Sequence, residues 1–217
     1  MRKSLIFDMD GTLFQTATVL EPALQDTFDH LRSCGWWEGE TPIAGYRRIM
    51  GAPLPKVWQT LMPRHSQEVR DYTDGYFLDR LVERITTGKA ALYPHVEELF
   101  AALKEAGCEI YIASNGLRAY LDAIVGYYGL HRWVTEVFSI EEIDSLDKTV
   151  LVERAVEKYD IRHGFMVGDR LSDFRAGKGN GLTTIGCRFD FSVAEELQQA
   201  DFVIDDLLEV KDIALFR

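Results

Sequence analysis

The sequence is poor in cysteine and has no long apolar run. Its three cysteines, Cys34, Cys108 and Cys187, are far apart and odd in number, so they make neither a disulfide framework nor a zinc-binding pattern. Its apolar stretches are too short and too interrupted to cross a bilayer. The chain also reaches acidic residues too early for a signal peptide. We therefore expect a cytoplasmic protein that does not bind membranes.

The sequence also lacks an excess of cations. It has 24 lysines and arginines against 35 acidic residues, a formal net charge of −11. This balance argues against a nucleic-acid backbone as the main partner. An anionic substrate would have to be attracted locally, by a divalent metal, a lysine or helix N-termini. With 217 residues, the chain is long enough for an α/β core and a smaller appended domain.

The order of apolar patterns predicts a Rossmann-like parallel sheet flanked by helices. A strand at residues 4–7 is followed, from about Thr16 to Ile85, by helical patterns only. From Pro94 onward helices alternate with strands, as in right-handed βα units. The strands are expected at residues 108–113, 164–168, 182–186 and 202–204. Residues 1–15 and 88–217 are therefore predicted to form the α/β core, with 16–87 as an inserted helical domain.

The first strand ends in an acidic motif, Leu-Ile-Phe-Asp-Met-Asp-Gly-Thr-Leu, at residues 5–13. Asp8 is expected at the carboxyl end of the strand, where open α/β sheets bind ligands. Asp10 points the same way on an extended chain, and two neighbouring carboxylates need a cation or a shared proton. Met9 points the opposite way and offers its backbone N–H to an anion. The pattern indicates a site for phosphate, Mg²⁺ and a carboxylate nucleophile.

Three further polar elements follow in the chain. Ser114 closes an apolar strand and is followed by Asn115, Lys148 opens a helix, and Asp169 ends a strand four residues before Asp173. Each has a simpler interpretation. Ser114 or Asn115 can cap a helix, Lys148 can pair with a nearby acid in solvent, and the two aspartates can cap a helix and stabilise its dipole.

Together, these motifs resemble those of the haloacid dehalogenase-like hydrolase superfamily, most of whose members are phosphatases. The helical insertion after the first motif resembles the cap of the cap type 1 branch, which contains phosphoglycolate phosphatase-like and β-phosphoglucomutase-like proteins. The resemblance implies that Asp8 is the nucleophile and that Asp10 is the general acid and base. It also implies phosphate ligands at Met9, Ser114 and Asn115, and Mg²⁺ ligands at Asp8, Asp10 through its carbonyl, Asp169 and Asp173.

Two assignments depend on local arguments as well. Many relatives have Lys-Pro where this chain has Lys148-Thr149. Lys148 at a helix start can nevertheless reach the phosphate, whereas Lys158 lies about 15 Å further along the helix axis. Thr12 is placed among the substrate-site residues because its hydroxyl can bond Asp10 or its backbone and fix the direction of the acid. It could equally be an ordinary turn residue.

Substrate choice is expected to depend on the cap. The stretch Tyr46-Arg47-Arg48-Ile49-Met50-Gly51 resembles one that relatives place on the underside of the cap. Arg48, or Arg47 or Lys56, could hold a second anionic group through its charge. Charged residues of this kind can also form a solvated helix face.

The sequence therefore predicts a Mg²⁺-dependent phosphatase that acts on a small phosphorylated metabolite, phosphoglycolate-phosphatase-like in type, as a monomer or homodimer. Three alternatives stay open at this stage. A haloacid dehalogenase needs neither Mg²⁺ nor the second acid, so Asp10 and Asp169 speak against it. A β-phosphoglucomutase-like phosphomutase would keep every motif. A binding or regulatory module usually lacks one catalytic element, and this chain lacks none.

Overall fold

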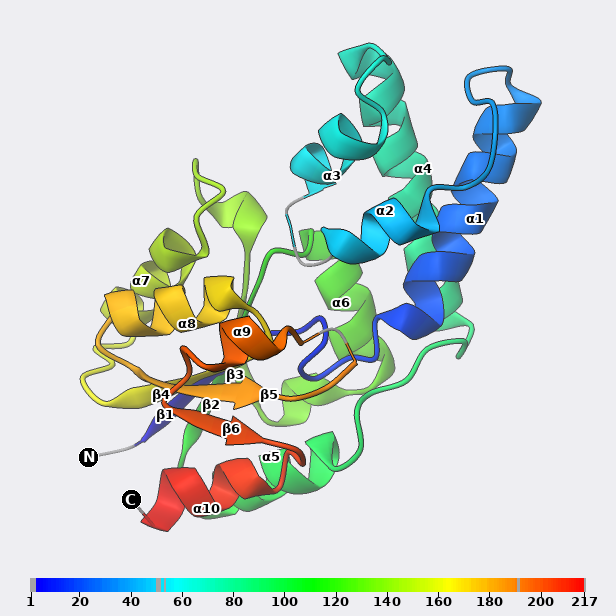
Figure 1. Ribbon diagram of the computed structural model, residues 1–217. Helices are drawn as coiled ribbons and strands as arrows, with labels where there is room; N and C mark the ends of the chain where they lie inside the picture. Colours follow the sequence, from blue (N-terminus) through cyan, green and yellow to red (C-terminus); the bar gives the residue numbers. More distant parts are fainter. Residues whose placement is uncertain (1–2, 50–51, 53, 191, 217) are drawn as a thin grey trace.

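Six parallel strands form one sheet in the computed structural model, which describes residues 3–49, 52, 54–190 and 192–216. The strand order is β3-β2-β1-β4-β5-β6 (Figure 1). The strands are β1 (Ser4–Phe7), β2 (Glu109–Ser114), β3 (Val134–Ser139), β4 (Gly164–Gly168), β5 (Thr183–Cys187) and β6 (Phe202–Ile204). Because β1 lies between β2 and β4, the chain order reverses beside it, and ligands bind at such a switch point in open α/β sheets.

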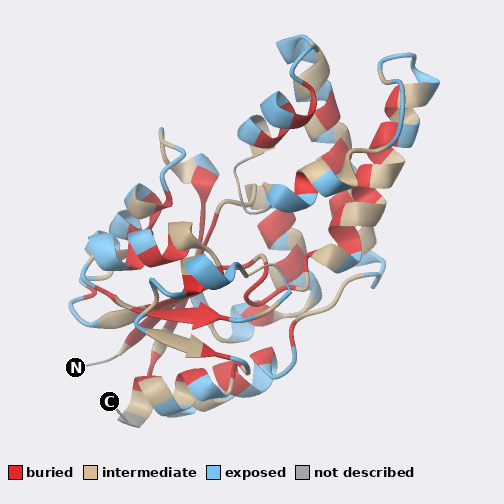
Figure 2. Cartoon of the chain, viewed as in Figure 1, coloured by how far each residue is buried: buried red, intermediate tan, exposed pale blue. Residues whose placement is uncertain are grey.

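Strand β1 lies in the middle of the sheet and is buried on both faces (Figure 2). Leu5 and Phe7 pack on one side with α5 (Val96–Glu105), α6 (Arg118–Tyr127) and α10 (Glu209–Phe216). Ile6 packs on the other side with α7 (Lys148–Lys158) and α8 (Leu171–Gly179). A four-residue helix, α9 (Ala194–Leu197), follows β5. The apolar run of β1 thus serves both layers of the core, as expected for a central parallel strand.

Four helices after β1 stand away from the sheet as a group (Figure 1). They are α1 (Ala17–Ser33), α2 (Ile43–Arg48), α3 (Leu54–Leu61) and α4 (Gln67–Thr86). Buried Phe28, Trp58 and Phe77 belong to their shared apolar interior. Helix α4 also contacts α6 of the sheet layer. These four helices are what we call the cap; its assignment as a separate domain, residues 16–87, stays a prediction.

The structure confirms the predicted Rossmann-like α/β fold, and two elements were missed. Strand β3 is an edge strand in which polar Thr135 and Glu136 interrupt the apolar pattern. Helix α10 is only eight residues long. None of the helices in the described ranges combines the length and apolar character needed to cross a membrane.

Candidate active site

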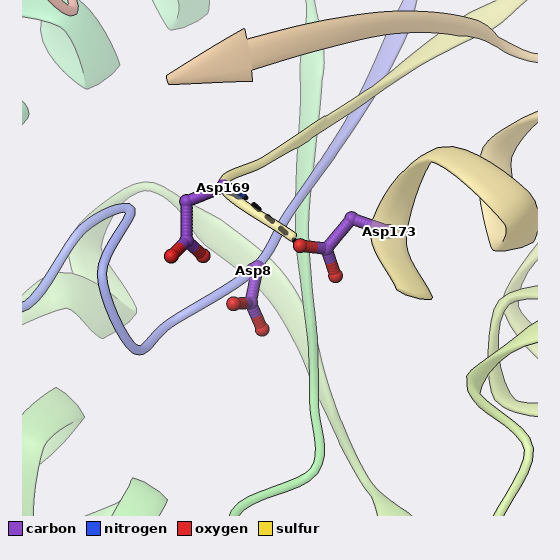
Figure 3. A group of neighbouring side chains, drawn as sticks. All are labelled: Asp8, Asp169 and Asp173. Atoms are coloured by element: carbon purple, nitrogen blue, oxygen red, sulfur yellow. Dashed lines mark hydrogen bonds between the residues drawn. The ribbon is translucent and has the colours of Figure 1, made fainter. Parts of the chain in front are cut away.

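Three buried carboxylates meet at the carboxyl end of the sheet. Asp8 follows β1, Asp169 follows β4, and Asp173 lies in the first turn of α8. One carboxylate oxygen from each lies within 4.8 Å of the others, and Figure 3 shows the three groups around one small space. Their side chains are almost wholly removed from water. Adjacent strands and the following helix therefore bring together acids that are 161 and 4 residues apart in the sequence.

Lys148 connects two of these acids. Its Nζ lies 2.5 Å from Oδ1 of Asp8 and 2.6 Å from Oδ1 of Asp173. It is the first residue of α7, directly after Asp147, whose carboxylate accepts the N–H of Thr149 as an N-cap. Only 4% of the lysine is exposed. Lys148 therefore reaches the sheet edge from the start of a helix, as predicted. It is not a solvated lysine.

Burial makes the charges of this cluster costly. Burial raises the pKa of the Asp8 carboxyl to about 7, although Lys148 opposes the shift. Burial, followed by the charges of Asp173 and Asp8, raises the pKa of Asp169 well above its ordinary value. For Lys148, burial lowers the pKa but the two carboxylates outweigh it, so the pKa is raised. One ammonium group thus cannot neutralise the charge of three carboxylates. The carboxylate oxygens are ligands of the kind that a divalent cation prefers.

Asp173 also shapes the turn between β4 and α8. Its Oδ2 accepts the backbone N–H of Asp169 at 3.2 Å and that of Arg170 at 3.0 Å. The first of these bonds is drawn in Figure 3. The capping interpretation of this pair is therefore partly right. The same carboxylate caps the helix with one oxygen and binds Lys148 with the other.

The turn after β1 brings its backbone close to Asp169. The carbonyl of Met9 accepts the N–H groups of Leu13 and Phe14, at 3.0 and 2.9 Å. Gly11 has φ of +76°, and a Cβ atom there would lie 2.5 Å from Oδ2 of Asp169. Both features require glycine at this position. The predicted role of the Met9 N–H as an anion ligand stays a prediction.

The groups that direct Asp10 differ from the predicted one. Oδ1 of Asp10 accepts the hydroxyls of Thr16 at 2.8 Å and Tyr120 at 2.6 Å. The predicted partner, Thr12, is fully buried and donates to Oδ1 of Asp169 at 3.5 Å instead. The turn closes so tightly that the Thr12 hydroxyl faces the acid from β4. The expected bond from Thr12 to Asp10 is therefore wrong.

Tyr120, like Thr16, is a site residue that sequence reasoning missed. It lies on α6, six residues after Ser114, and its ring faces the cap. Burial, followed by the charge of Asp10, raises its pKa well above the ordinary value, so the phenol stays protonated and can donate. Removal from water also raises the pKa of Asp10, which the two hydroxyl donors oppose. A tyrosine at this spacing has no motif signal, because its pairing with Asp10 depends on the fold.

The connection from β2 to the next helix lies beside Asp8, because β2 is the neighbour of β1 in the sheet. Ser114 is buried at the end of β2, and its Oγ accepts the N–H of Gly116 at 3.0 Å. Asn115 lines the space between the cap and the core. That space is a cavity of about 50 Å³, bordered by Asp10, Thr16 and apolar side chains that include Phe77. The assignment of Ser114 and Asn115 as phosphate ligands stays a prediction.

Arg48 lies on the cap and faces the core across a wider opening. It is exposed on α2 and borders a groove of about 810 Å³ together with Lys56, Asn115 and Lys148. Arg47 is excluded from this group because its Nε bonds Glu21 on α1 at 2.5 Å. Met50 and Gly51 of the cap stretch lie outside the described residues. Arg48 is thus positioned near the acidic cluster, and its contact with substrate stays a prediction.

Comparisons with known proteins agree with this geometry. A family profile described as haloacid dehalogenase-like hydrolase matches residues 3–181. The phosphoglycolate phosphatase of Vibrio vulnificus (strain YJ016) is 24% identical over 225 residues, which cover 98% of this chain and 96% of that protein.

Two solved structures share the fold. A predicted phosphoglycolate phosphatase from Haemophilus somnus has a TM-score of 0.85 at 18% identity, covering 98% of this chain and 97% of its own. CbbY from Rhodobacter sphaeroides in complex with xylulose-(1,5)bisphosphate has a TM-score of 0.81 at 20% identity, covering 96% of both chains. The chain therefore belongs to the haloacid dehalogenase-like hydrolases, as a phosphatase of that family, which confirms the predicted family and enzyme class.

Proposed function

We propose that this phosphatase hydrolyses a small phosphorylated metabolite through an aspartyl-phosphate on Asp8, with Mg²⁺ as its metal. The observation that carries the proposal is the buried cluster in which Lys148 Nζ lies 2.5 Å from Asp8 and 2.6 Å from Asp173, with Asp169 beside them. A phosphate monoester is a poor electrophile, so a catalyst has to neutralise charge, align an oxygen and protonate the leaving group.

Asp8 is the proposed nucleophile. Its carboxylate attacks phosphorus, the bond to the leaving oxygen breaks, and water then cleaves the aspartyl-phosphate, so one difficult displacement becomes two easier ones. Lys148 keeps Asp8 charged against the effect of burial and shields it from the anionic substrate. Ser114 and the N–H groups of Met9 and Asn115 are the proposed ligands of the phosphoryl oxygens.

Asp10 is the proposed general acid and base. In the first step it gives its proton to the leaving oxygen, and in the second it accepts a proton from the attacking water. Removal from water raises its pKa, which favours the protonated form that the first step needs. Thr16 and Tyr120 hold Oδ1, at 2.8 and 2.6 Å, and leave Oδ2 for this transfer.

The carboxylates of Asp8, Asp169 and Asp173, and the carbonyl of Asp10, are the proposed Mg²⁺ ligands. Their buried, repelling charges and their oxygen chemistry fit a hard divalent cation. When bound, such a cation would neutralise phosphate charge at this end of the sheet. The hydroxyl of Thr12 donates to Asp169 at 3.5 Å, so Thr12 is proposed to orient this metal ligand and not to contact the substrate.

The substrate is proposed to be phosphoglycolate-like, a sugar phosphate, a nucleotide or pyrophosphate. The names of the relatives support this range, since they include phosphoglycolate phosphatases and a protein bound to a sugar bisphosphate. A cytoplasmic location, a monomeric or homodimeric state, and a cap domain of residues 16–87 are further proposals. The finding that supports the location is that no described helix is suited to crossing a membrane.

Hydrolysis of a panel of phosphate esters tests the proposal. The panel holds phosphoglycolate, pyrophosphate, sugar phosphates, nucleotides and an aryl phosphate, each with Mg²⁺ or with EDTA. We expect Mg²⁺-dependent turnover that Asp8→Asn abolishes. Asp160→Asn is the matched control, because Asp160 is an exposed aspartate at the other end of the sheet. Turnover of no ester, aryl phosphate included, would contradict the proposal and point to a phosphomutase that needs a primer or to a binding role.

A further inference from the structure

The groove between the cap and the core has a charge opposite to that of the whole protein. Five cationic and two acidic side chains border it, whereas the chain carries −11. The cations are Arg48 and Lys56 from the cap and Lys148, Arg170 and Arg175 from the core, and the acids are Asp147 and Glu196. Lys148, which borders the groove, also binds Asp8, so the groove lies beside the proposed nucleophile. An anion therefore meets a locally favourable field there.

Both acids of the groove are already engaged. Asp147 caps α7 through the N–H of Thr149, at 2.9 Å. Oε2 of Glu196 accepts Nε of Arg170 at 3.0 Å and the N–H of Leu171 at 2.8 Å. Glu196 therefore fixes Arg170, which directly follows Asp169, at the base of the groove. The charge of Arg175 also acts on Glu196, although no hydrogen bond or ion pair joins the two side chains.

Three of the cations form no ion pair within the described part of the chain. There, the side chains of Arg48, Lys56 and Arg175 make no hydrogen bond and no ion pair, and all three are exposed. Several arginines away from the groove form ion pairs with acids; Arg84 binds Asp26, for example. The unpaired cations thus lie on both walls of one groove.

One face of helix α8 forms the wall of the groove on the core side. Leu171, Ser172 and Arg175 border the groove, at spacings of three and four residues. Asp173 and Phe174, between them, are buried towards the core. The helix that supplies one proposed metal ligand therefore also presents a guanidinium group to the groove.

We propose that Arg175, with Arg170 beside it, forms a core-side subsite for a second anionic group of the substrate, a phosphate or a carboxylate. Arg48 and Lys56 face this subsite from the cap. The inference rests on the proposed function and narrows it to substrates with two anionic groups. A guanidinium group binds either anion through two parallel hydrogen bonds, which gives selectivity as well as affinity.

Selectivity between esters is the direct test. The measured quantity is kcat/KM for phosphoglycolate and for a sugar bisphosphate, each divided by kcat/KM for an aryl phosphate. In Arg175→Ala at least one of these ratios should fall about tenfold, mainly through KM, because one charge-assisted anion contact is lost. A fall for phosphoglycolate alone assigns the subsite to a carboxylate, and a fall for the bisphosphate alone assigns it to a phosphate.

Lys178→Ala is the matched control. Lys178 lies on the same helix but faces Asp201, at 3.5 Å, and does not border the groove. Its ratios should equal those of the wild type. Unchanged ratios in Arg175→Ala, or an equal loss for all three esters, would overturn the subsite. Failure of the wild type to hydrolyse the aryl phosphate would instead count against the proposed function.

A binding measurement keeps the subsite testable without turnover. Calorimetry compares an alkyl phosphonate that carries a carboxylate with the same phosphonate carrying a methyl group. The wild type should prefer the carboxylate compound, and Arg175→Ala should lose about tenfold of that preference. Equal affinities for the two compounds in the wild type would contradict a carboxylate subsite, and a bisphosphonate then tests the phosphate one in the same way.

Discussion

The two ends of the sheet use charged residues in opposite ways. At the carboxyl end, Asp8, Asp173 and Lys148 form ion pairs whose side chains are at most 9% exposed. At the amino end, Arg162 and Asp160 form a 3.0 Å pair before β4 whose side chains are 72% and 75% exposed. Burying charge is costly, so a fold that needs only stability has no reason to do it. The contrast indicates that the carboxyl end is organised for chemistry and the amino end for solubility.

The two ends of helix α7 show the same difference between a buried and an exposed charge. Lys148 begins it and is buried between two carboxylates, whereas Lys158 ends it and binds Glu136 at 2.7 Å with half of its side chain exposed. The same residue type in one helix thus has two environments. Parallel mutations at the two ends of the sheet therefore test whether buried and exposed charges differ in their effect.

The largest effect is expected for Lys148→Met. Removal of the ammonium leaves Asp8 and Asp173 buried without a cation, so metal-free protein should lose about 3 kcal/mol of unfolding free energy. Hydrolysis should fall by about 10³, since the nucleophile loses its proposed shield. Lys158→Met, the control, should cost about 0.5 kcal/mol or less. Urea denaturation and ester turnover measure both; equal losses in the two variants would refute the contrast.

Metal binding should stabilise the carboxyl end specifically. Mg²⁺ at 100 times its dissociation constant should add about 2.7 kcal/mol to the unfolding free energy, relative to EDTA. Asp169→Asn should remove most of this gain, because it deletes one proposed ligand. Asp205→Asn, whose carboxylate forms an exposed pair with Arg188, should retain it. Thermal unfolding with and without Mg²⁺ gives the comparison, and a full gain in Asp169→Asn would rule out that residue as a ligand.

A smaller effect is expected for Tyr120→Phe, which removes one of two donors from Asp10. We expect kcat to fall about tenfold for an alkyl phosphate, since a misplaced acid protonates the leaving oxygen less well. An aryl phosphate, whose leaving group needs less protonation, should lose less. Tyr159→Phe removes a similar bond, to Glu136 at 2.6 Å, on the other side of the molecule and should not change kcat. Equal losses for both esters would argue against a role through Asp10.

The smallest effect belongs to Asp201, which precedes β6 at the amino end of the sheet. Burial alone would raise its pKa, yet the N–H and hydroxyl of Thr184, at 2.8 and 2.7 Å, hold the pKa below its ordinary value. A lowered folded-state pKa stabilises the protein above the unfolded-state value of about 4, and this stabilisation is lost as the pH falls further.

Asp201→Asn should therefore cost about 0.5 kcal/mol at pH 7, a small amount because the side chain is partly exposed. The difference from the wild type should shrink below about pH 4. Denaturation curves from pH 3 to pH 7 check the trend. A cost that grows on acidification would contradict the assigned direction of the pKa shift.

The sequence was informative where one short segment carries both a structure and its chemistry. Asp8, Ser114 and Asp169 each end an apolar strand, so parallel strand order alone brings them to one edge. Lys148 was identified because helix starts share that edge. Strand β3 escaped because an edge strand carries polar residues such as Glu136. Tyr120 escaped as a partner of Asp10 because it is 110 positions away and only the packing of α6 brings it near.

The most direct test of the account is to trap the phosphorylated enzyme. Acid quenching during turnover of an aryl phosphate with Mg²⁺, followed by peptide mass spectrometry, locates any covalent phosphoryl group. We expect one phosphoryl group on Asp8, absent with EDTA and absent in Asp8→Asn. Phosphorylation at another residue, or steady hydrolysis by Asp8→Asn at the wild-type rate, would contradict it.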